Sequence, residues 1–230
     1  LALKEIAPRL YMVGNSGGNS IFRVTDNGVV LVDTKLRGEA YYNQLMDLIK
    51  VRSNQPVRYA VVTHVHLDHS GNIEFFVKNG TQVVAHENLV KNLETYTPAD
   101  GVKPANPNVT YSKDYSIRLG NTEVAHVYHF ASGHTSGDSI VHFPDLGVVA
   151  MGDQLALPSA VCDYALGGSI PGWAQLINEV LELNFDLAIP GHMREEYPFG
   201  PATRESLLAL KAELDSITKN AIGLVKKGTP

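Results

Sequence analysis

The six residues 64–69 read His-Val-His-Leu-Asp-His, so four side chains able to bind a metal ion lie within one short segment. The apolar run 59–63 directly precedes them, which predicts a buried strand whose carboxyl end carries a metal-binding loop. His64 and His66 can chelate one cation from the same side of an extended loop, while the last two ligands face a second position. Imidazole and carboxylate groups without a thiolate suit zinc, with iron and manganese as alternatives. The competing interpretation is a surface turn that happens to carry histidines.

This order of ligands, His-x-His-x-Asp-His, resembles the signature of the metallo-β-lactamase superfamily, a group of binuclear metal hydrolases. The superfamily adds three ligands later in the chain, namely a histidine, an acidic bridging residue and a final histidine. The sequence offers all three in the same order, with His134 in Ser-Gly-His-Thr, Asp153 in Met-Gly-Asp and His192 in Ile-Pro-Gly-His. The resemblance extends from Ile6 to His192, which is nearly the whole chain.

The resemblance implies a role for each ligand: the first metal is bound by His64, His66 and His134, the second by Asp68, His69 and His192, and Asp153 bridges the two. Two zinc ions that share a water lower its pKa towards neutrality, so that a hydroxide can attack a carbonyl carbon. Asp68 is expected to orient that hydroxide. The resemblance also suggests that Asp33, at the end of an earlier strand, supports the metal loop, although an ordinary turn residue explains it equally well.

The implied reaction is hydrolysis of an amide or ester bond in a small cyclic substrate, of which a β-lactam is one form. The best-known β-lactamase branch has a cysteine in place of Asp153 and a lysine three residues beyond, where this chain has Ala156. Thioesterases of the glyoxalase II type keep the aspartate, but they add a helical domain that exceeds the 38 residues after His192. Lactonases fit both the ligands and the size, so lactam and lactone remain alternatives.

Two other classes of protein deserve comparison. Flavodiiron-type oxidoreductases normally carry glutamate where His66 stands and add a flavin domain, which does not follow here. A non-catalytic metal-binding protein would have lost ligands, and none is missing. Substrate contacts are expected from Arg194, Tyr164 and Tyr197, with further cationic anchors at Lys35 and Arg37. Ordinary solvated surface charge is the alternative interpretation for the cations.

Composition limits the remaining functions. The chain has 230 residues, of which 44% are hydrophobic, and this size predicts a single domain over 1–230. A formal net charge of −5 without a polybasic run offers no footprint for nucleic acid or an anionic membrane, so a small-molecule substrate is expected. The single Cys162 excludes an intramolecular disulfide framework, and no apolar run is long enough to span a bilayer. The first residue, Leu1, fits removal of a signal peptide, so a periplasmic or secreted location is expected, with a cytoplasmic one as the alternative. The sequence does not reveal the oligomeric state.

Hydrophobic periodicity predicts the elements that position these residues. Helices are expected over 38–51, 71–79, 87–96, 171–183 and 203–224. Strands are expected over 6–13, 20–24, 29–32, 59–63, 81–85, 115–119, 123–129, 139–143, 148–151 and 185–189, and loops over 97–108 and 154–170. This order indicates an α/β fold with two sheets packed face to face and helices outside, which the resemblance identifies as a four-layer αβ/βα sandwich. The histidines without ligand spacing are expected to be structural: His86, His126, His129 and His142.

Overall fold

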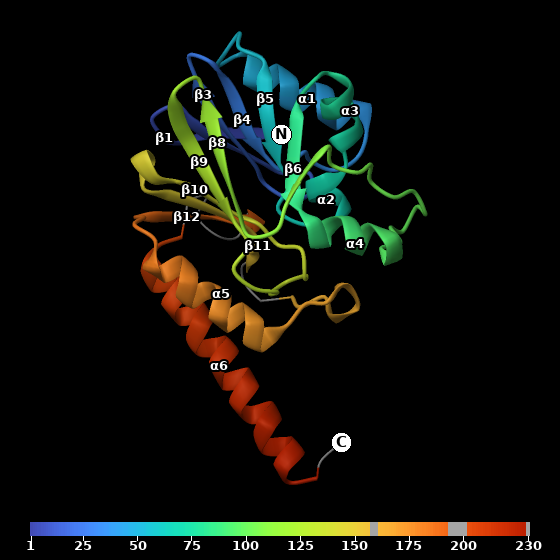
Figure 1. Cartoon of the computed structure of the whole chain (residues 1–230), viewed down its shortest axis with the longest axis vertical. Helices are drawn as coiled ribbons and strands as arrows, with labels where there is room; N and C mark the ends of the chain where they lie inside the picture. The colour runs from blue at the N-terminus through green and yellow to red at the C-terminus, as the bar shows by residue number, and fades with distance from the viewer. Residues whose placement is uncertain (157–160, 193–201, 229–230) are drawn as a thin grey trace.

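The computed structural model describes residues 1–156, 161–192 and 202–228, and it contains two β-sheets with helices on their outer faces (Figure 1). The first sheet contains, in spatial order, β1 (Ala2–Ala7), β2 (Leu10–Gly14), β3 (Ser20–Thr25), β4 (Gly28–Val32), β5 (Val57–Val61), β6 (Gln82–His86) and β7 (Val109–Tyr111). Its first four strands are antiparallel neighbours, and β4 to β7 run parallel. The parallel strands end together at one edge, where a site can be assembled from distant residues.

The second sheet has the spatial order β12 (Leu187–His192), β11 (Val148–Ala156), β10 (Ile140–Phe143), β9 (Thr122–Tyr128) and β8 (Asp114–Leu119). Strands β8 to β11 are antiparallel neighbours, and β12 pairs parallel to β11. The helices are α1 (Glu39–Lys50), α2 (Leu67–Ser70), α3 (Ile73–Lys78), α4 (Glu87–Thr95), α5 (Ile170–Glu182) and α6 (Arg204–Lys226).

Three apolar clusters separate four layers. Alternate residues of β4 divide between two clusters: Val29 and Leu31 pack with α1 and α3, whereas Val30 and Val32 pack against the second sheet. This division follows from the period of two along a strand. The third cluster lies between the second sheet and the last two helices, with Trp173 of α5 fully buried in it. The predicted αβ/βα sandwich is therefore confirmed.

Several predicted boundaries were wrong. The expected strand over 6–13 is two strands that turn at Pro8 and Arg9, and the short strand β7 lies in a stretch without a clear pattern. The metal loop includes one helical turn, α2, which was not expected. Strand β11 continues through Ala156, so Asp153 lies inside a strand instead of after one. The extension pairs with β12 through register shifts, which apolar alternation does not reveal.

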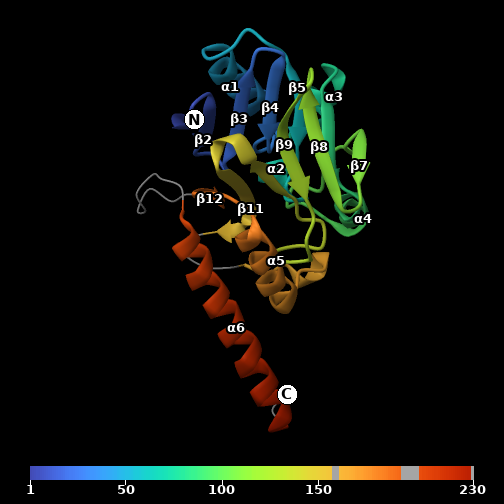
Figure 2. The same ribbon diagram turned by 60° about the vertical axis from the view of Figure 1, so that its left-hand side comes forward.

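Helix α6 begins after Thr203, which makes the expected N-terminal cap. Its buried residues are Leu207 and Leu214, which pack in the third cluster beside α5. Figures 1 and 2 show the C-terminal half of this helix extending away from the two sheets. Among the described residues, no helix has the length and apolar character needed to cross a membrane.

Candidate metal centre

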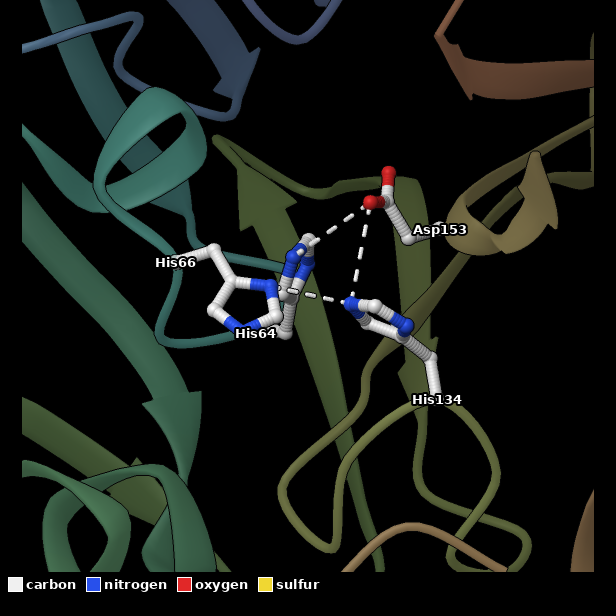
Figure 3. Close-up of side chains that lie close together, drawn as sticks. All are labelled: His64, His66, His134 and Asp153. Atoms are coloured by element: carbon white, nitrogen blue, oxygen red, sulfur yellow. Dashed lines mark hydrogen bonds and ion pairs between the residues drawn. The ribbon is translucent and has the colours of Figure 1, made fainter. Parts of the chain in front are cut away.

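All seven predicted ligands lie in two neighbouring groups. Within each group, every residue offers one ligand atom, and these atoms lie within 4.8 Å of one another. The first group contains His64, His66, His134 and Asp153 (Figure 3), and the second contains Asp68, His69 and His192. They come from the segment after β5, from α2, from the loop after β9, and from strands β11 and β12. The fold thus brings the seven predicted side chains close together and places Asp153, expected between the two sets, with the first group.

Hydrogen bonds fix the orientation of two imidazoles in the first group. His66 Nε2 donates to Asp163 Oδ2 at 3.0 Å, and His134 Nδ1 donates to the carbonyl oxygen of Val161. Each ring therefore turns its bare nitrogen inward, and His66 Nδ1 lies 2.9 Å from His134 Nε2 (Figure 3). Two nitrogen lone pairs repel each other at this distance unless a cation or a proton lies with them.

Asp33 fixes two further imidazoles from behind the site. Its Oδ2 accepts a hydrogen bond from His69 Nδ1 at 2.7 Å and another from Thr63 Oγ1 at 2.8 Å. Since the threonine proton points to the carboxylate, Thr63 Oγ1 accepts from His64 Nδ1 at 3.1 Å. The Nε2 atom of His64 is left without a proton and faces inward. His69 Nε2 also faces inward, and although burial would lower the pKa of His69, the neighbouring Asp153 and Asp33 raise it well above its ordinary value. Asp33 thus makes the contacts of a supporting residue, as the resemblance suggested.

Asp153 lies between the two groups. Its Oδ2 is 3.6 Å from His134 Nε2 and 3.4 Å from His192 Nε2, and its Oδ1 is 3.3 Å from His69 Nε2. Among the described residues, Asp153 Oδ1 and His64 Nε2 are buried polar atoms with no hydrogen-bond partner. Such orphaned atoms are rare in folded proteins. A cation with nitrogen and oxygen ligands would satisfy both, so the residues present fit a metal.

The close packing of imidazoles and carboxylates shifts the pKa values of these side chains. Burial, together with His69, lowers the pKa of His64 well below its ordinary value. Burial alone would lower the pKa of His192, but hydrogen bonds to Asp153 and Asp68 outweigh it and raise that pKa to about 9. For Asp153, the neighbouring His69 and His64 outweigh burial and hold the pKa well below its usual range. The site therefore combines anionic carboxylates with a neutral His64 and a His192 that holds a proton at neutral pH. A cation would displace that proton, because a histidine ligand must be neutral.

The candidate ligands differ in exposure, and the more exposed ones are His192 and Asp68 of the second group and, at 22%, His66 of the first. The side chains of His64, His69 and His134 are at most 3% exposed. Those of His192 and Asp68 are 34% and 25% exposed. A substrate can reach the cation positions from this open side.

The predicted substrate contacts lie in different surroundings. Tyr164 lies on a short 3-10 turn and is 69% exposed, and its contact with substrate stays a prediction. Arg194 and Tyr197 lie outside the described residues. The interpretation of Lys35 as a substrate anchor or solvated charge was wrong, because its side chain is fully buried. Arg37 pairs with Asp100 at the surface, as an ordinary surface cation would.

Sequence reasoning missed two carboxylates beside the first group. Asp163 holds His66, and no motif marks it. Asp138 is fully buried and accepts hydrogen bonds from the backbone N–H groups of Gly133 and Thr135 and from Thr135 Oγ1, which shapes the loop carrying His134. Burial raises the pKa of Asp138 to about 7. The Thr-x-x-Asp spacing is the signal that could have identified this residue.

Comparison with known proteins identifies the family. A family model described as the metallo-beta-lactamase superfamily matches residues 13–192. This chain belongs to the metallo-beta-lactamase superfamily. It is accordingly a metal-dependent hydrolase, of a family whose members act on small-molecule substrates.

The chain is similar to three other proteins, two of which are named as metallo-beta-lactamases. Metallo-beta-lactamase IND-1 of Chryseobacterium indologenes is 32% identical over 178 residues, covering 76% of this chain and 71% of that protein. The alpha subunit of a 2,4-dinitroanisole O-demethylase from Nocardioides sp. (strain JS1661) is 28% identical over 171 residues, covering 73% of this chain and 50% of that protein. The structure of the metallo-beta-lactamase FIM-1 from Pseudomonas aeruginosa in its mono-zinc form aligns with a TM-score of 0.75 at 19% identity, covering 94% and 95% of the two chains.

Proposed function

We propose that this chain is a single-domain, binuclear zinc hydrolase that opens an amide or ester bond in a small cyclic substrate. The observation that carries the proposal is the pair of bare nitrogens, His66 Nδ1 and His134 Nε2, held 2.9 Å apart by outer hydrogen bonds. A second inward-facing set, with His69 Nε2 3.2 Å from His192 Nε2, lies across Asp153. Two such sets support two cations instead of one.

Zinc is the proposed metal because the donor set is rich in imidazole and contains no thiolate. The first zinc would be held by His64, His66 and His134, the second by Asp68, His69 and His192, with Asp153 between them. Iron and manganese remain alternatives, since their preferred ligands overlap with this set. When bound, the two ions would supply a water that ionises near neutral pH and would polarise the substrate carbonyl.

The protein's own side chains would orient the reactants. Asp68 Oδ2 lies 3.2 Å from His192 Nε2 on the open side of the centre, where it can accept a hydrogen bond from the attacking water and orient it. The neighbouring His69 and His192 keep the pKa of this carboxyl far below its usual range despite burial, so Asp68 is ionised at neutral pH. The buried imidazoles behind it exclude bulk water from the other side.

A lactone is the second candidate substrate. The carboxylate of Asp153 stands between the two groups, where the best-known β-lactamases carry a cysteine, and this difference favours the wider hydrolase family. The likeness to an O-demethylase subunit at 28% identity also supports a range of substrates beyond β-lactams.

The deciding experiment compares kcat/KM of the zinc-loaded protein on a chromogenic cephalosporin and on a simple lactone in one preparation. A value of about 10⁴ M⁻¹s⁻¹ or more on the cephalosporin would identify a β-lactamase, and faster lactone opening would identify a lactonase. Both activities should disappear when a chelator removes the zinc. A zinc-replete protein that hydrolyses neither substrate would contradict the proposal and favour a non-catalytic metal-binding protein.

A further inference from the structure

Lys35 is a lysine with no exposed surface, an unusual position for a charged side chain. Its Nζ donates hydrogen bonds to the carbonyl oxygens of Asn15 and Gly18, at 2.8 and 2.7 Å. Both carbonyls belong to the loop between β2 and β3, here called the 15–19 loop. Burying an ammonium group is costly unless it is compensated, so this contact holds the loop firmly to the segment after β4.

The 15–19 loop has a backbone that needs such support. Asn15, Ser16 and Gly17 have φ values of 69°, 57° and 87°, so three successive residues adopt the left-handed conformation. Residues other than glycine rarely adopt it, and several in succession are not stable without surrounding contacts. Lys35 can supply this support, because its two acceptors are the carbonyl of Asn15, the first of these residues, and that of Gly18, which follows the last of them.

The same loop lies against Asp68 and His69 and is hydrogen-bonded to the two residues that precede His192. A Cβ added to Gly17 would lie 2.7 Å from Cβ of Asp68, and one added to Gly18 would overlap the imidazole of His69. At its far end, Asn19 donates from its backbone to Gly191 at 2.6 Å and from Nδ2 to Pro190 at 2.9 Å, just before His192. The loop therefore fits closely between α2 and the end of β12.

We propose that Lys35 is a positioning residue, whose buried ammonium fixes the 15–19 loop against Asp68, His69 and His192 and thereby sets the zinc affinity of the second group. This inference rests on the proposed second zinc position. The ammonium also lies near the carboxylates of Asp33 and Asp68, which oppose the effect of burial; burial lowers the pKa of Lys35 to about 8. The side chain is therefore largely charged at pH 7.

The test is a zinc titration against a chromophoric chelator with the full chain and its Lys35→Met variant. Methionine keeps the length and volume of the lysine stem but removes the charge and the donors. We expect the first zinc to bind as in the wild type and the second to bind about 10- to 100-fold more weakly, the range for loss of an outer partner of a metal ligand. Hydrogen exchange in the 15–19 loop should become faster in the same variant.

A matched control is Lys103→Met. The Lys103 ammonium also donates to two backbone carbonyls, those of Leu93 and Glu94, but these lie at the end of α4. Its loss should leave both zinc affinities unchanged. If Lys35→Met does not fold, Asn19→Ala replaces it, because this change loosens the loop from its other end and should weaken the same zinc.

The outcomes separate this inference from the function on which it rests. Wild-type protein that binds fewer than two zinc ions would contradict the binuclear proposal itself. Two zinc ions in the wild type, with equal or tighter second binding in the variant, would overturn the role of Lys35 alone. Equal weakening of both zinc ions would also overturn it, since a general structural defect acts on both groups.

Discussion

The two halves of the metal centre are held by different parts of the chain. The outer nitrogens of His66 and His134 bind Asp163 and Val161, which lie on one loop after β11. His69 is held by Asp33, and the backbone of the 15–19 loop packs against it. The first half thus depends on a late loop of the second sheet, and the second half on early segments of the first sheet. Each half should be open to disruption without the other, except at Asp153 and, more weakly, at Asp33, which also reaches His64 of the first half through Thr63.

Asp153→Ala should have the largest effect, because this carboxylate lies within 3.8 Å of imidazole nitrogens from both halves. Its loss leaves those imidazoles without their shared anion. We expect loss of at least one zinc and a fall in kcat/KM of more than about 100-fold, beyond the effect of losing an outer partner. Zinc content and turnover are measured together, with the exposed Asp47→Ala as control. Two zinc ions with normal turnover in Asp153→Ala would disprove the assignment.

Asp33→Asn should act chiefly on the second half. The amide keeps the shape of the carboxylate but cannot accept hydrogen bonds at both positions, where His69 Nδ1 and the N–H and Oγ1 of Thr63 donate. We expect the second zinc to bind about 100-fold more weakly, at the upper end for an outer partner. Competition titration resolves the two affinities. A greater loss at the first zinc would contradict the division into halves.

Asp163→Asn should weaken the first zinc alone, and by less. The Asp163 side chain is 26% exposed and His66 is 22% exposed, so water can replace part of the lost hydrogen bond. An effect of about 10-fold is expected, with the second zinc unchanged. The same competition titration measures both zinc affinities. We expect Asp163→Asn to weaken the first zinc and Asp33→Asn to weaken chiefly the second. Identical patterns in the two variants would mean that the halves are not separately supported.

The smallest effect concerns a histidine pair beside the first half. His86 and His129 stack with ring centroids 3.7 Å apart, and His129 Nδ1 donates to the backbone carbonyl of Asp138. Burial and then the neighbouring His129 lower the pKa of His86 to about 4, and its Nδ1 already accepts from the backbone of Asn88.

Since the unfolded chain binds this proton near pH 6.5 and the folded chain does not, stability is lost as the pH falls from about 6.5 to 4. The contribution of one such histidine is at most about 1.4 kcal/mol per pH unit. His86→Asn, which can still cap α4, should make the decline shallower in chemical denaturation of metal-free protein. An unchanged slope would show that His86 does not contribute.

The clustering of the seven candidate ligands could be predicted from the sequence, because residues able to bind metal are dense in one motif and recur after glycines in a fixed order. Asp33 could be recognised for a different reason, because it directly follows an apolar strand. Asp163 was not, because its contact with His66 depends on the path of a loop 97 residues later in the chain. Lys35 was misread because its acceptors are backbone carbonyls, which leave no side-chain pattern.

The strands, too, were predictable where local periodicity marks them and not where tertiary contacts set their ends. Strands with apolar alternation on two buried faces, such as β4, were found close to their true bounds. The end of β11 was missed, because its pairing with β12 shifts register twice and Trp173 Nε1 holds the carbonyl of Gln154. Such contacts depend on tertiary structure and not on local periodicity.

The most direct test of two separately supported zinc positions is anomalous scattering at the zinc edge from crystals of the zinc-loaded protein. The account predicts two peaks, each about 2.0–2.1 Å from its histidine nitrogens. The first should be bound by His66 through Nδ1 and by His134 through Nε2, and the second by His69 through Nε2. A single peak, or a zinc bound to His66 Nε2 in place of its contact with Asp163, would contradict the account.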